Sequence, residues 1–450
     1  MPESASETVP GTVKRKRANR WYAIALLGAV SISGCAEGDS VPEEARSASG
    51  LEQPPADAPA LLTASGAGAA VDTVVSNLEV PWSLDFANDG RVFVTERGGQ
   101  VRVIEKGVLR AEPWAVLPVF GREEQIAPES GLMGIALAPD FASSGHVFVH
   151  GTFWKRSQAP LSRAIDKAFR RIAGVFSPRA AIPYENRVYR LTDRGGKGVD
   201  ATVVIDDLPT NFYHAGGALA FGPDGNLYVA VGEALASAFS DDPETASGQI
   251  LRYRADGSVP EDNPIPGSPV YAIGLRNPQA LAWHPMRNLL ITTEHGPSFL
   301  PHEGGRSGKD ELNLVTPGAN YGWPVVAGRA GDARFVDPVA EWSPAIAPGG
   351  IAVYTGAYAP WQGNAFVGGL RGQQLRRIVF DSAAAAAGHL KVIQEEVLLS
   401  QTVGRIRAVR MGPDGHLWIT TSNRDGRGVP SAQDDLVLRV RPQPGTNKVR

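Results

Sequence analysis

Short hydrophobic runs recur along most of the chain, and a polar turn precedes many of them. Within residues 211–233, the runs Leu219-Ala-Phe221 and Leu227-Tyr-Val-Ala-Val231 flank the turn sequence Gly222-Pro-Asp-Gly225. Glycine, proline and aspartate suit tight turns, whereas short runs of β-branched and aromatic residues suit strands. The pattern therefore predicts two strands joined by a turn.

The same unit, a polar turn followed by a short strand, occurs six times. Successive copies lie roughly 50 to 85 residues apart, which is near the length of a four-stranded blade with variable loops. The copies occupy residues 88–96, 139–150, 223–233, 285–294, 361–370 and 413–421. We therefore predict an all-β fold, a six-bladed β-propeller with four-stranded blades. A two-sheet sandwich would not need so many equivalent units.

The composition agrees with this fold class. The chain has 450 residues, of which 43% are hydrophobic and 20% charged, and it contains 51 glycines and 35 prolines. So much glycine and proline favours a turn-rich β protein over a helical one. A net charge of −3 gives no reason to expect a nucleic-acid partner.

The N-terminal segment has the features of an export signal. Lys14–Arg17 precede an apolar stretch, residues 21–32, that is too short to span a bilayer comfortably. The stretch runs into Ile32-Ser-Gly-Cys35, which resembles the lipobox of bacterial lipoproteins, and Cys35 is the only cysteine of the chain. Residues 1–34 are therefore predicted to be a lipoprotein-type signal peptide, with an ordinary signal peptide as the alternative.

The segments after the signal follow from this prediction. Cys35 would carry the lipid, and residues 35–70, rich in small and acidic residues, would form a flexible linker. The propeller is expected over residues 71–442, with a C-terminal tail over 443–450. We expect an exported protein at the periplasmic face of a bacterial membrane, at the outer membrane in a Gram-negative cell. The lipid anchor would be its one membrane contact.

An insertion over residues 155–184 interrupts the second repeat. It contains residues 161–172, a candidate for a basic amphipathic helix. We expect a surface excursion with a charged face, and the alternative is a lid or a partner-docking element.

Loops on one face of a propeller converge on its axis, so the residues outside the repeats are candidates for a site. His214 precedes one predicted strand and Glu233 ends the next, which makes them expected neighbours. A carboxylate beside an imidazole fixes its tautomer and raises its basicity, as a general base requires. An ordinary histidine near a turn is the alternative.

Four arginines lie near the ends of predicted strands, namely Arg276, Arg371, Arg405 and Arg407. Guanidinium groups pair well with carboxylates. If these arginines converge, they would bind a polyanion, and the alternative for each is a surface ion pair.

Several other runs do not look like connecting segments. They are Val80-Pro-Trp82, Gly131-Leu-Met-Gly134, His214-Ala-Gly-Gly217, Gly248–Arg252, Asp256–Pro264, Gly274-Leu-Arg-Asn-Pro278, Asn320-Tyr-Gly-Trp-Pro324 and Arg405-Ile-Arg407. Together they resemble the soluble glucose/sorbosone dehydrogenase family, quinoproteins that include the aldose sugar dehydrogenases. The resemblance extends from about residue 71 to residue 442.

The resemblance implies a propeller that binds pyrroloquinoline quinone (PQQ) and calcium (Ca²⁺) at one end of its axis. The implied activity is oxidation of an aldose sugar at its anomeric carbon to a lactone, with electrons passed to an external acceptor. His214 would be the general base that removes the hydroxyl proton as hydride moves to the quinone. Glu233 would support it, where an aspartate is common in the family, and Arg276 would complete the catalytic set.

The resemblance also implies the residues that hold the cofactors. PQQ contacts fall on Arg276, Asn277, Arg405 and Arg407, on Arg371, where some members have lysine, and on Glu129, where some have glutamine. An unpaired negative charge at Glu129 would weaken PQQ binding. The main-chain carbonyls of Gly296 and Pro297 would hold calcium, a cation that prefers oxygen ligands and would polarise the quinone carbonyl.

Two functions of other classes remain as alternatives. A calcium-dependent lactonase should have acidic side chains at the axis, whereas these loops offer mainly arginines. A carbohydrate- or protein-binding propeller lipoprotein without catalysis would have lost PQQ. Ala218, where the family often has arginine, and Glu129 keep that alternative open.

Overall fold

The computed structural model describes residues 67–120, 129–155, 184–300 and 303–444. The predicted signal peptide with Cys35, most of the predicted linker, the candidate helix at 161–172 and the end of the C-terminal tail lie outside the described residues.

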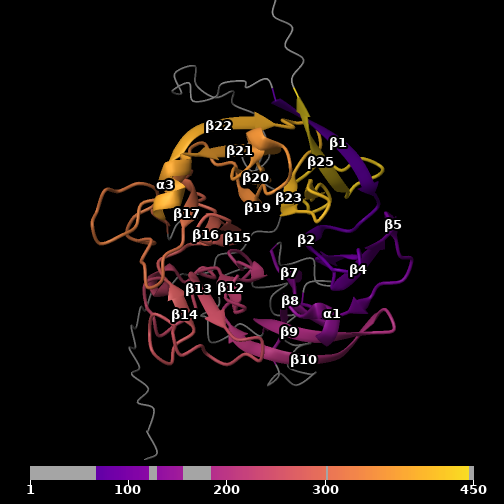
Figure 1. Cartoon of the computed structure of the whole chain (residues 1–450). Coiled ribbons are helices and arrows are strands. Elements are labelled where there is room, and N and C mark those ends of the chain that lie inside the picture. The colour runs from indigo at the N-terminus through magenta and orange to yellow at the C-terminus, as the bar shows by residue number, and fades with distance from the viewer. Residues whose placement is uncertain (1–66, 121–128, 156–183, 301–302, 445–450) are drawn as a thin grey trace, which may run out of the picture. The chain divides into compact units, whose positions relative to one another are not determined.

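Six antiparallel sheets follow one another along the chain and surround a common axis (Figure 1). Blade 1 contains β2 (Pro81–Phe86), β3 (Val92–Glu96), β4 (Gln100–Glu105), β5 (Val108–Leu109) and β6 (Ala115–Val116), and blade 2 contains β7 (Leu132–Leu137), β8 (His146–Trp154), β9 (Tyr184–Arg194) and β10 (Lys197–Leu208). Blade 3 contains β11 (Leu219–Phe221), β12 (Leu227–Val231), β13 (Gln249–Tyr253) and β14 (Val270–Ala272), and blade 4 contains β15 (Pro278–His284), β16 (Leu289–Glu294), β17 (Asp310–Leu314) and β18 (Ala340–Trp342). Blade 5 contains β19 (Pro348–Val353), β20 (Ala365–Gly369), β21 (Gln374–Phe380) and β22 (Val392–Leu398), and blade 6 contains β23 (Ile406–Met411), β24 (Leu417–Thr421), β25 (Val437–Pro444) and β1 (Ala67–Val75). The predicted six-bladed propeller is confirmed.

Each sequence repeat supplies the second strand of a blade, namely β3, β8, β12, β16, β20 or β24. The predicted pair of strands within residues 211–233 is formed by β11 and β12, with Leu219 opposite Val229 and Phe221 opposite Leu227. The repeat therefore marks the same structural position six times, the turn from the innermost strand and the strand that follows it.

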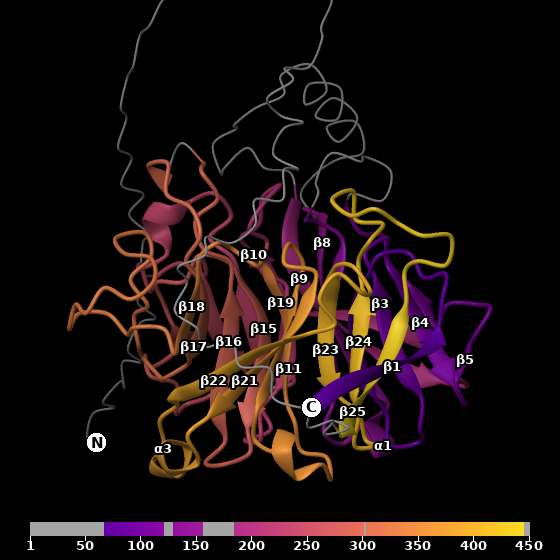
Figure 2. The same ribbon diagram turned by 90° about the horizontal axis from the view of Figure 1, so that it is seen from above.

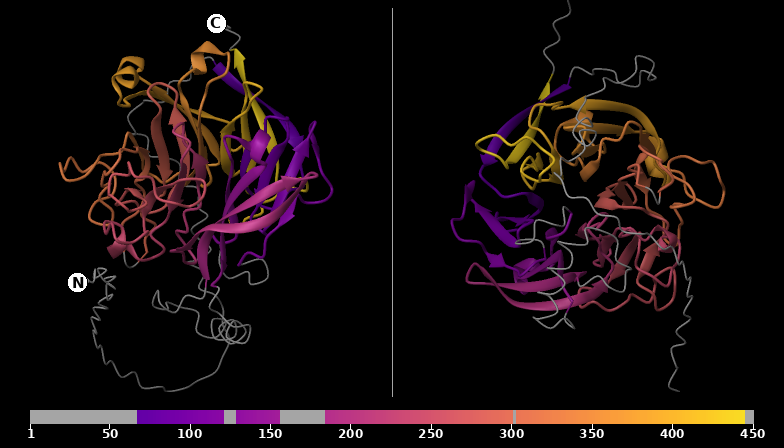
Figure 3. Two further views of the ribbon diagram at one scale, coloured as in Figure 1. Left: turned by 60° about the horizontal axis from the view of Figure 1, so that its bottom comes forward. Right: turned by 180° about the vertical axis from the view of Figure 1, so that it is seen from behind.

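The last blade contains the first strand of the described chain. β1 pairs with β25 from Ala67 opposite Pro444 to Val75 opposite Val437. Figure 1 shows indigo β1 beside yellow β25, and the view from behind in Figure 3 shows the same pair. This pairing closes the ring, and both strands extend a few residues past the expected limits at 71 and 442.

The helices within the described ranges are short and lie in connections between strands. They are α1 (Phe141–Ser144), α3 (Ser382–Ala387), η4 (Ser237–Phe239) and η6 (Ala359–Trp361). At the start of α3, the Asp381 carboxylate accepts hydrogen bonds from the backbone N–H groups of Ala383 and Ala384, as an N-cap should. Among the described helices, none has the length and apolar content needed to cross a bilayer.

Strand direction divides the molecule into two faces. Because the strands are antiparallel, the start of each innermost strand lies beside the end of the second, as Pro278 lies opposite Glu294. Loops that enter the innermost strands and loops that leave the second strands therefore gather at one end, which we call the loop face. The turns between first and second strands, with α1 and α3, form the opposite end, which we call the turn face and which is lowermost in Figure 2.

Apolar side chains pack between neighbouring blades. Phe93 of blade 1 is fully buried. Its ring meets Trp114 and Phe141 edge to face, with centroid distances of 5.3 and 5.7 Å. Phe141 lies on α1 of blade 2, so this cluster joins two blades and holds their loops in a fixed relation.

We predict that Phe93→Ala destabilises the protein by about 3–5 kcal/mol, because it removes a buried ring and leaves a cavity between blades. Chemical denaturation followed by tryptophan fluorescence would measure the loss. Val108→Ala, in the same blade at a side chain 67% exposed, is the control and should change stability by less than about 0.5 kcal/mol. A similar effect of both substitutions would contradict this account of the inter-blade core.

Candidate active site

His214 and Glu233 lie together on the loop face, as predicted from their positions around β11 and β12. His214 Nδ1 bonds Glu233 Oε1, and Ser237 Oγ donates to the other carboxylate oxygen at 2.7 Å. His214 is 5% exposed and Glu233 is fully buried. His214 also has φ of 58°, so a left-handed backbone turns its imidazole toward the carboxylate.

Arg276 contacts the other ring nitrogen of His214. Its Nη2 lies 2.8 Å from His214 Nε2, its Nε donates to Glu303 Oε1 at 2.5 Å, and its Nη1 donates to the carbonyl of His295 at 2.9 Å. Arginine can only donate here, so Nε2 is the acceptor and Nδ1 carries the proton that Glu233 accepts. The two contacts fix one neutral tautomer of His214.

Asn277 connects the His214 loop to the next strand. Its Oδ1 accepts hydrogen bonds from the backbone N–H of Gly216 at 3.1 Å and from Gln279 Nε2 at 3.0 Å. Asn277 is fully buried, and its Nδ2 has no hydrogen-bond partner among the described residues. An unused buried donor thus remains beside the candidate base.

Arg407 is a buried cation that forms no ion pair with a described carboxylate, although Asp425 and Glu129 are near enough to raise its pKa against the effect of burial. Its Nη1 donates to Gln279 Oε1 at 2.9 Å, and its guanidinium carbon lies 3.9 Å from the ring centroid of Trp82. Its Nε has no hydrogen-bond partner among the described residues. Burial lowers the pKa of Arg407 to about 9, so it remains protonated at neutral pH. Among the described residues its direct contacts are neutral, and a buried charge without an ion-pair partner is suited to an anionic ligand.

Arg405 and Glu129 each have a partner of opposite charge. Arg405 donates from Nε and Nη2 to Asp425 Oδ2, at 3.0 and 2.8 Å. Glu129 Oε2 accepts the backbone N–H of His214 at 2.7 Å, and Oε1 accepts from Arg427 at 3.2 Å. Burial raises the pKa of Glu129, but the combined effect of neighbours that include His214 and Arg427 is larger and of opposite sign, so the net shift of the pKa is downward. The extra negative charge expected at this position is therefore paired.

Arg371 and the Gly296–Pro297 pair also lie on the loop face. Arg371 lies on the turn between β20 and β21, where its exposed guanidinium bonds to no described side chain. Gly296 and Pro297 follow β16 directly, and the backbone N–H of Gly296 donates to Asp310 Oδ1 at 2.9 Å. A Cβ at Gly296 would lie 2.1 Å from the carbonyl of Gly308, so only glycine fits.

His295 lies among these groups. It receives Arg276 at its carbonyl, and its Nε2 lies 3.0 Å from the carbonyl of Pro348. Burial lowers its pKa to about 3, Glu129 opposes that shift, and the cations Arg407 and Arg276 add to it. Since Glu129, Arg407 and Arg276 all affect the pKa of His295, these predicted site residues lie close to one another.

Sequence reasoning missed Ser237, Glu303, Asp425 and Arg427. Each lies in a loop that leaves a second strand, after β12, β16 or β24. Their position in these loops could have indicated them, because such loops share the loop face with the predicted residues. Their residue types could not have indicated them, since exposed loops also carry serine, glutamate, aspartate and arginine.

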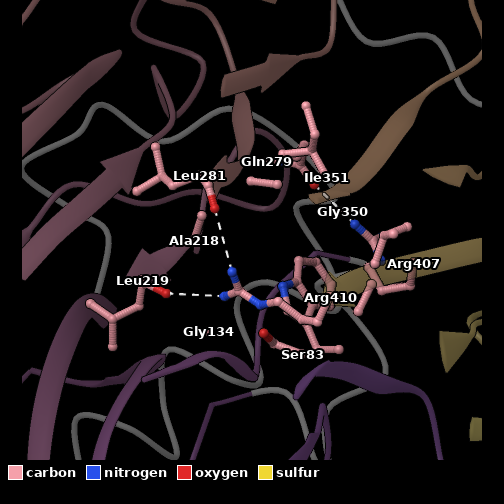
Figure 4. Close-up of a pocket in the computed structure, with 14 residues that line it drawn as sticks. Ser83, Gly134, Ala218, Leu219, Gln279, Leu281, Gly350, Ile351, Arg407 and Arg410 are labelled. Carbon is pink, nitrogen blue, oxygen red and sulfur yellow. Dashed lines mark hydrogen bonds between the residues drawn. The ribbon is translucent and has the colours of Figure 1, made fainter. Parts of the chain in front are cut away.

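A small cavity of about 30 Å³ lies on the axis beneath this cluster. Figure 4 shows Arg407 near Gln279 above it, and Arg410 reaching the carbonyls of Leu219 and Leu281, each at 3.4 Å. Arg410 thereby bridges two innermost strands across the axis. The cavity has room for about one water molecule, so any organic ligand must lie outside it, toward the loop face.

The described residues thus form a six-bladed propeller whose loop face holds a buried His–Glu pair and a buried arginine, and this defines a propeller with a polar axial site. Residues 78–431 match the family model for Glucose / Sorbosone dehydrogenase, and the chain belongs to that family.

The relatives agree with this assignment. Aldose sugar dehydrogenase YliI of Escherichia coli (strain K12) is 28% identical over 387 residues, which cover 81% of this chain and 93% of the relative. The PQQ-bound aldose sugar dehydrogenase of Streptomyces coelicolor is 32% identical with a TM-score of 0.67, over 83% of this chain and 98% of that chain. A candidate oxidoreductase (glucose dehydrogenase) of Thermus thermophilus is 39% identical with a TM-score of 0.69, over 83% and 100%.

The loop that carries His214 rests on a buried histidine of the neighbouring blade. His150, on β8, is fully buried, and its imidazole faces the backbone of Gly217 and Ala218. Burial lowers the pKa of His150 from 6.5 to about 4. The unfolded chain therefore binds a proton at this residue before the folded protein does, so stability is lost as the pH falls from about 6.5 to about 4.

We predict that His150→Gln removes part of this pH dependence. The parent should lose up to about 3 kcal/mol through this group between pH 7 and pH 4, a loss that glutamine cannot contribute. Denaturation midpoints measured at several pH values would test it, with His389→Gln, at an exposed position, as the control. Equal pH profiles for the parent and His150→Gln would contradict the prediction.

Proposed function

We propose that this protein is a PQQ- and calcium-dependent dehydrogenase. It oxidises aldose sugars at the anomeric carbon to lactones and passes the electrons to an external acceptor. Membership of the glucose/sorbosone dehydrogenase family supports a sugar dehydrogenase. The PQQ-bound relative from Streptomyces coelicolor supports the choice of cofactor.

One observation carries the proposal. A histidine held in a single tautomer by Glu233 shares a hydrogen-bonded network with Arg407, a buried cation without an ion-pair partner among the described residues. The network runs from the His214 loop through Asn277 and Gln279 to Arg407. A base and an anion-binding group joined in this way suit a reaction between a sugar hydroxyl and an anionic cofactor.

His214 is the proposed general base. Glu233 holds the Nδ1 proton, so Nε2 is the atom that takes the hydroxyl proton of the sugar. Arg276 Nη2 lies 2.8 Å from this nitrogen, so the hydroxyl must approach beside Arg276 or take its place. A guanidinium at that point would also stabilise the negative charge that develops on the sugar oxygen.

The proposed cofactor contacts fit a polycarboxylate quinone. Arg407 on β23 and the unused Nδ2 of Asn277, in the loop before β15, offer donors. Arg405, directly before β23, adds a positive charge that it shares with Asp425. Arg371 adds an exposed guanidinium, and Glu129, neutralised by Arg427, brings no net charge against the cofactor. When bound, PQQ would supply a quinone able to accept two electrons.

The proposed calcium ligands are the main-chain carbonyls of Gly296 and Pro297. Among the described residues, no group of three or more His, Cys, Asp or Glu side chains could hold a metal. Main-chain oxygens are therefore the suitable donors, and they match the preference of this cation. When bound, calcium would act as a Lewis acid beside the quinone.

No observation favours the two alternatives. A calcium-dependent lactonase should present unpaired carboxylates at the axis. The loop-face carboxylates Glu129, Glu303 and Asp425 each bind an arginine, and Glu233 binds His214. Glu294 and Asp310 are buried there and accept hydrogen bonds from backbone N–H groups. A propeller that only binds carbohydrate or protein would have no need for the buried His–Glu pair.

Reconstitution tests the function. The purified protein should bind PQQ in the presence of calcium and then reduce a dye acceptor with at least one sugar from a panel of aldoses. Absorbance and calorimetry would follow PQQ binding independently of turnover. Failure to bind PQQ would remove the proposal.

We predict that His214→Ala retains PQQ binding and lowers kcat by about 10²–10⁴-fold, because the proton acceptor is lost. His389→Ala, which removes an exposed histidine far along the chain, should leave both properties unchanged. If His214→Ala lost PQQ together with activity, His214 would be a cofactor ligand and not the base.

We also propose export and lipidation at Cys35. In a bacterial host, the mature chain should begin at Cys35, incorporate labelled fatty acid and sediment with membranes. Cys35→Ala should abolish the label and release the protein from the membrane fraction, because one acylated residue provides the anchor. A labelled Cys35→Ala protein, or an unlabelled parent, would contradict this prediction.

A further inference from the structure

A second pocket lies on the turn face, between blades 3 and 4. Its volume is about 480 Å³, within the range of small-molecule sites. The residues that decide its chemistry are Tyr228, Tyr271, Trp283, Asn288, Leu290 and Thr316. Gly388, at the end of α3, also borders it, and α3 lies at the lower edge of Figure 2. The pocket is therefore separate from the loop face.

Three aromatic rings shape this pocket. Among its lining side chains, Tyr228, only 5% exposed, and Leu290 are buried, whereas the rings of Tyr271 and Trp283 are half-buried. Tyr228 meets both rings edge to face, with centroid distances of 5.1 Å to Tyr271 and 5.3 Å to Trp283. Such packing leaves little freedom to the rings, so the pocket is formed before any ligand arrives.

The polar groups of the pocket are close to neutral in sum. Asp224 is its one carboxylate, and Arg252 Nε and the Tyr228 hydroxyl donate to it at 2.9 and 3.0 Å. The carboxylate is therefore already compensated. A free cation or a free anion would find no unpaired charge of opposite sign in the lining.

Two hydrogen-bonding groups of the pocket are unused. Neither the side-chain amide of Asn288 nor Trp283 Nε1 bonds to a described residue. Asn288 lies on the exposed turn between β15 and β16 with φ of 50°, so its side chain is placed at the rim. A purely apolar ligand would leave both groups without partners, which costs affinity.

We propose that this turn-face pocket binds a neutral saccharide. A sugar ring presents C–H groups that pack against aromatic side chains and hydroxyls that pair with an amide and an indole N–H. The pocket offers both, with no net charge and with room for one or two sugar rings. Because it lies at the opposite end of the blades from His214, a bound glycan would leave the loop face open.

The site does not depend on the proposed oxidation, so the test uses the full-length chain without PQQ or calcium. Calorimetric titration with maltotetraose, cellotetraose and chitotetraose should give a Kd of about 1 mM or tighter for at least one of them. Trp283→Ala should weaken that binding at least about tenfold, and Asn288→Gly about threefold. Glycine at 288 retains the left-handed turn, so this variant separates the side chain from the backbone.

Matched controls distinguish the two faces. Met286→Ala, on the same turn but outside the lining, and Asn77→Gly, at another left-handed position with φ of 61°, should bind as the parent does. His214→Ala should also bind normally. Absence of binding by all three tetrasaccharides overturns the proposal, as does binding lost in His214→Ala but kept in Trp283→Ala. If Trp283→Ala does not fold, Asn288→Gly decides, and failed sugar oxidation would leave this result intact.

Discussion

The pairing of β1 with β25 is the constraint on which the arrangement of the molecule depends. It joins the two ends of the described chain in one sheet, so each of the six blades has a neighbour on both sides. The innermost strands then surround one axis, and the loops that enter them must meet at its end. Without that pairing, blades 1 and 6 would not be held against each other. The loops at β7 and β23 would then not be fixed at one common site.

Closure of the ring buries many charged side chains together on the loop face, and their hydrogen-bond partners determine how costly each buried charge is. Arg276 bonds Glu303, Arg405 bonds Asp425 and Glu129 bonds Arg427, whereas Arg407 has Gln279 and Trp82 as its direct side-chain contacts in the part of the chain that the structure describes. A buried ion with its partner is tolerated, but one without a partner is costly. That cost is the physical reason to propose Arg407 as an anion-binding residue.

The two faces of the propeller differ in the charge of the side chains that they present. The loop face is built from long connections that carry charged residues, and its pairs hold each other in place. On the turn face, the pocket between blades 3 and 4 is aromatic and nearly neutral. The proposed proton transfer would therefore take place on the loop face, and the proposed saccharide would bind on the turn face.

The sequence by itself determined the blade count, the second strand of each blade and the family, because these are local patterns that repeat or match motifs. It also named the neighbours His214 and Glu233, since a short turn between β11 and β12 brings them together. Only the tertiary structure decided which arginine pairs with which acid, because partners such as Glu129 and Arg427 lie 298 residues apart. It likewise decided that Arg371 is exposed and that Arg407 forms no ion pair with a described carboxylate. Spacing along the chain carries no information on contacts that form only when the ring closes.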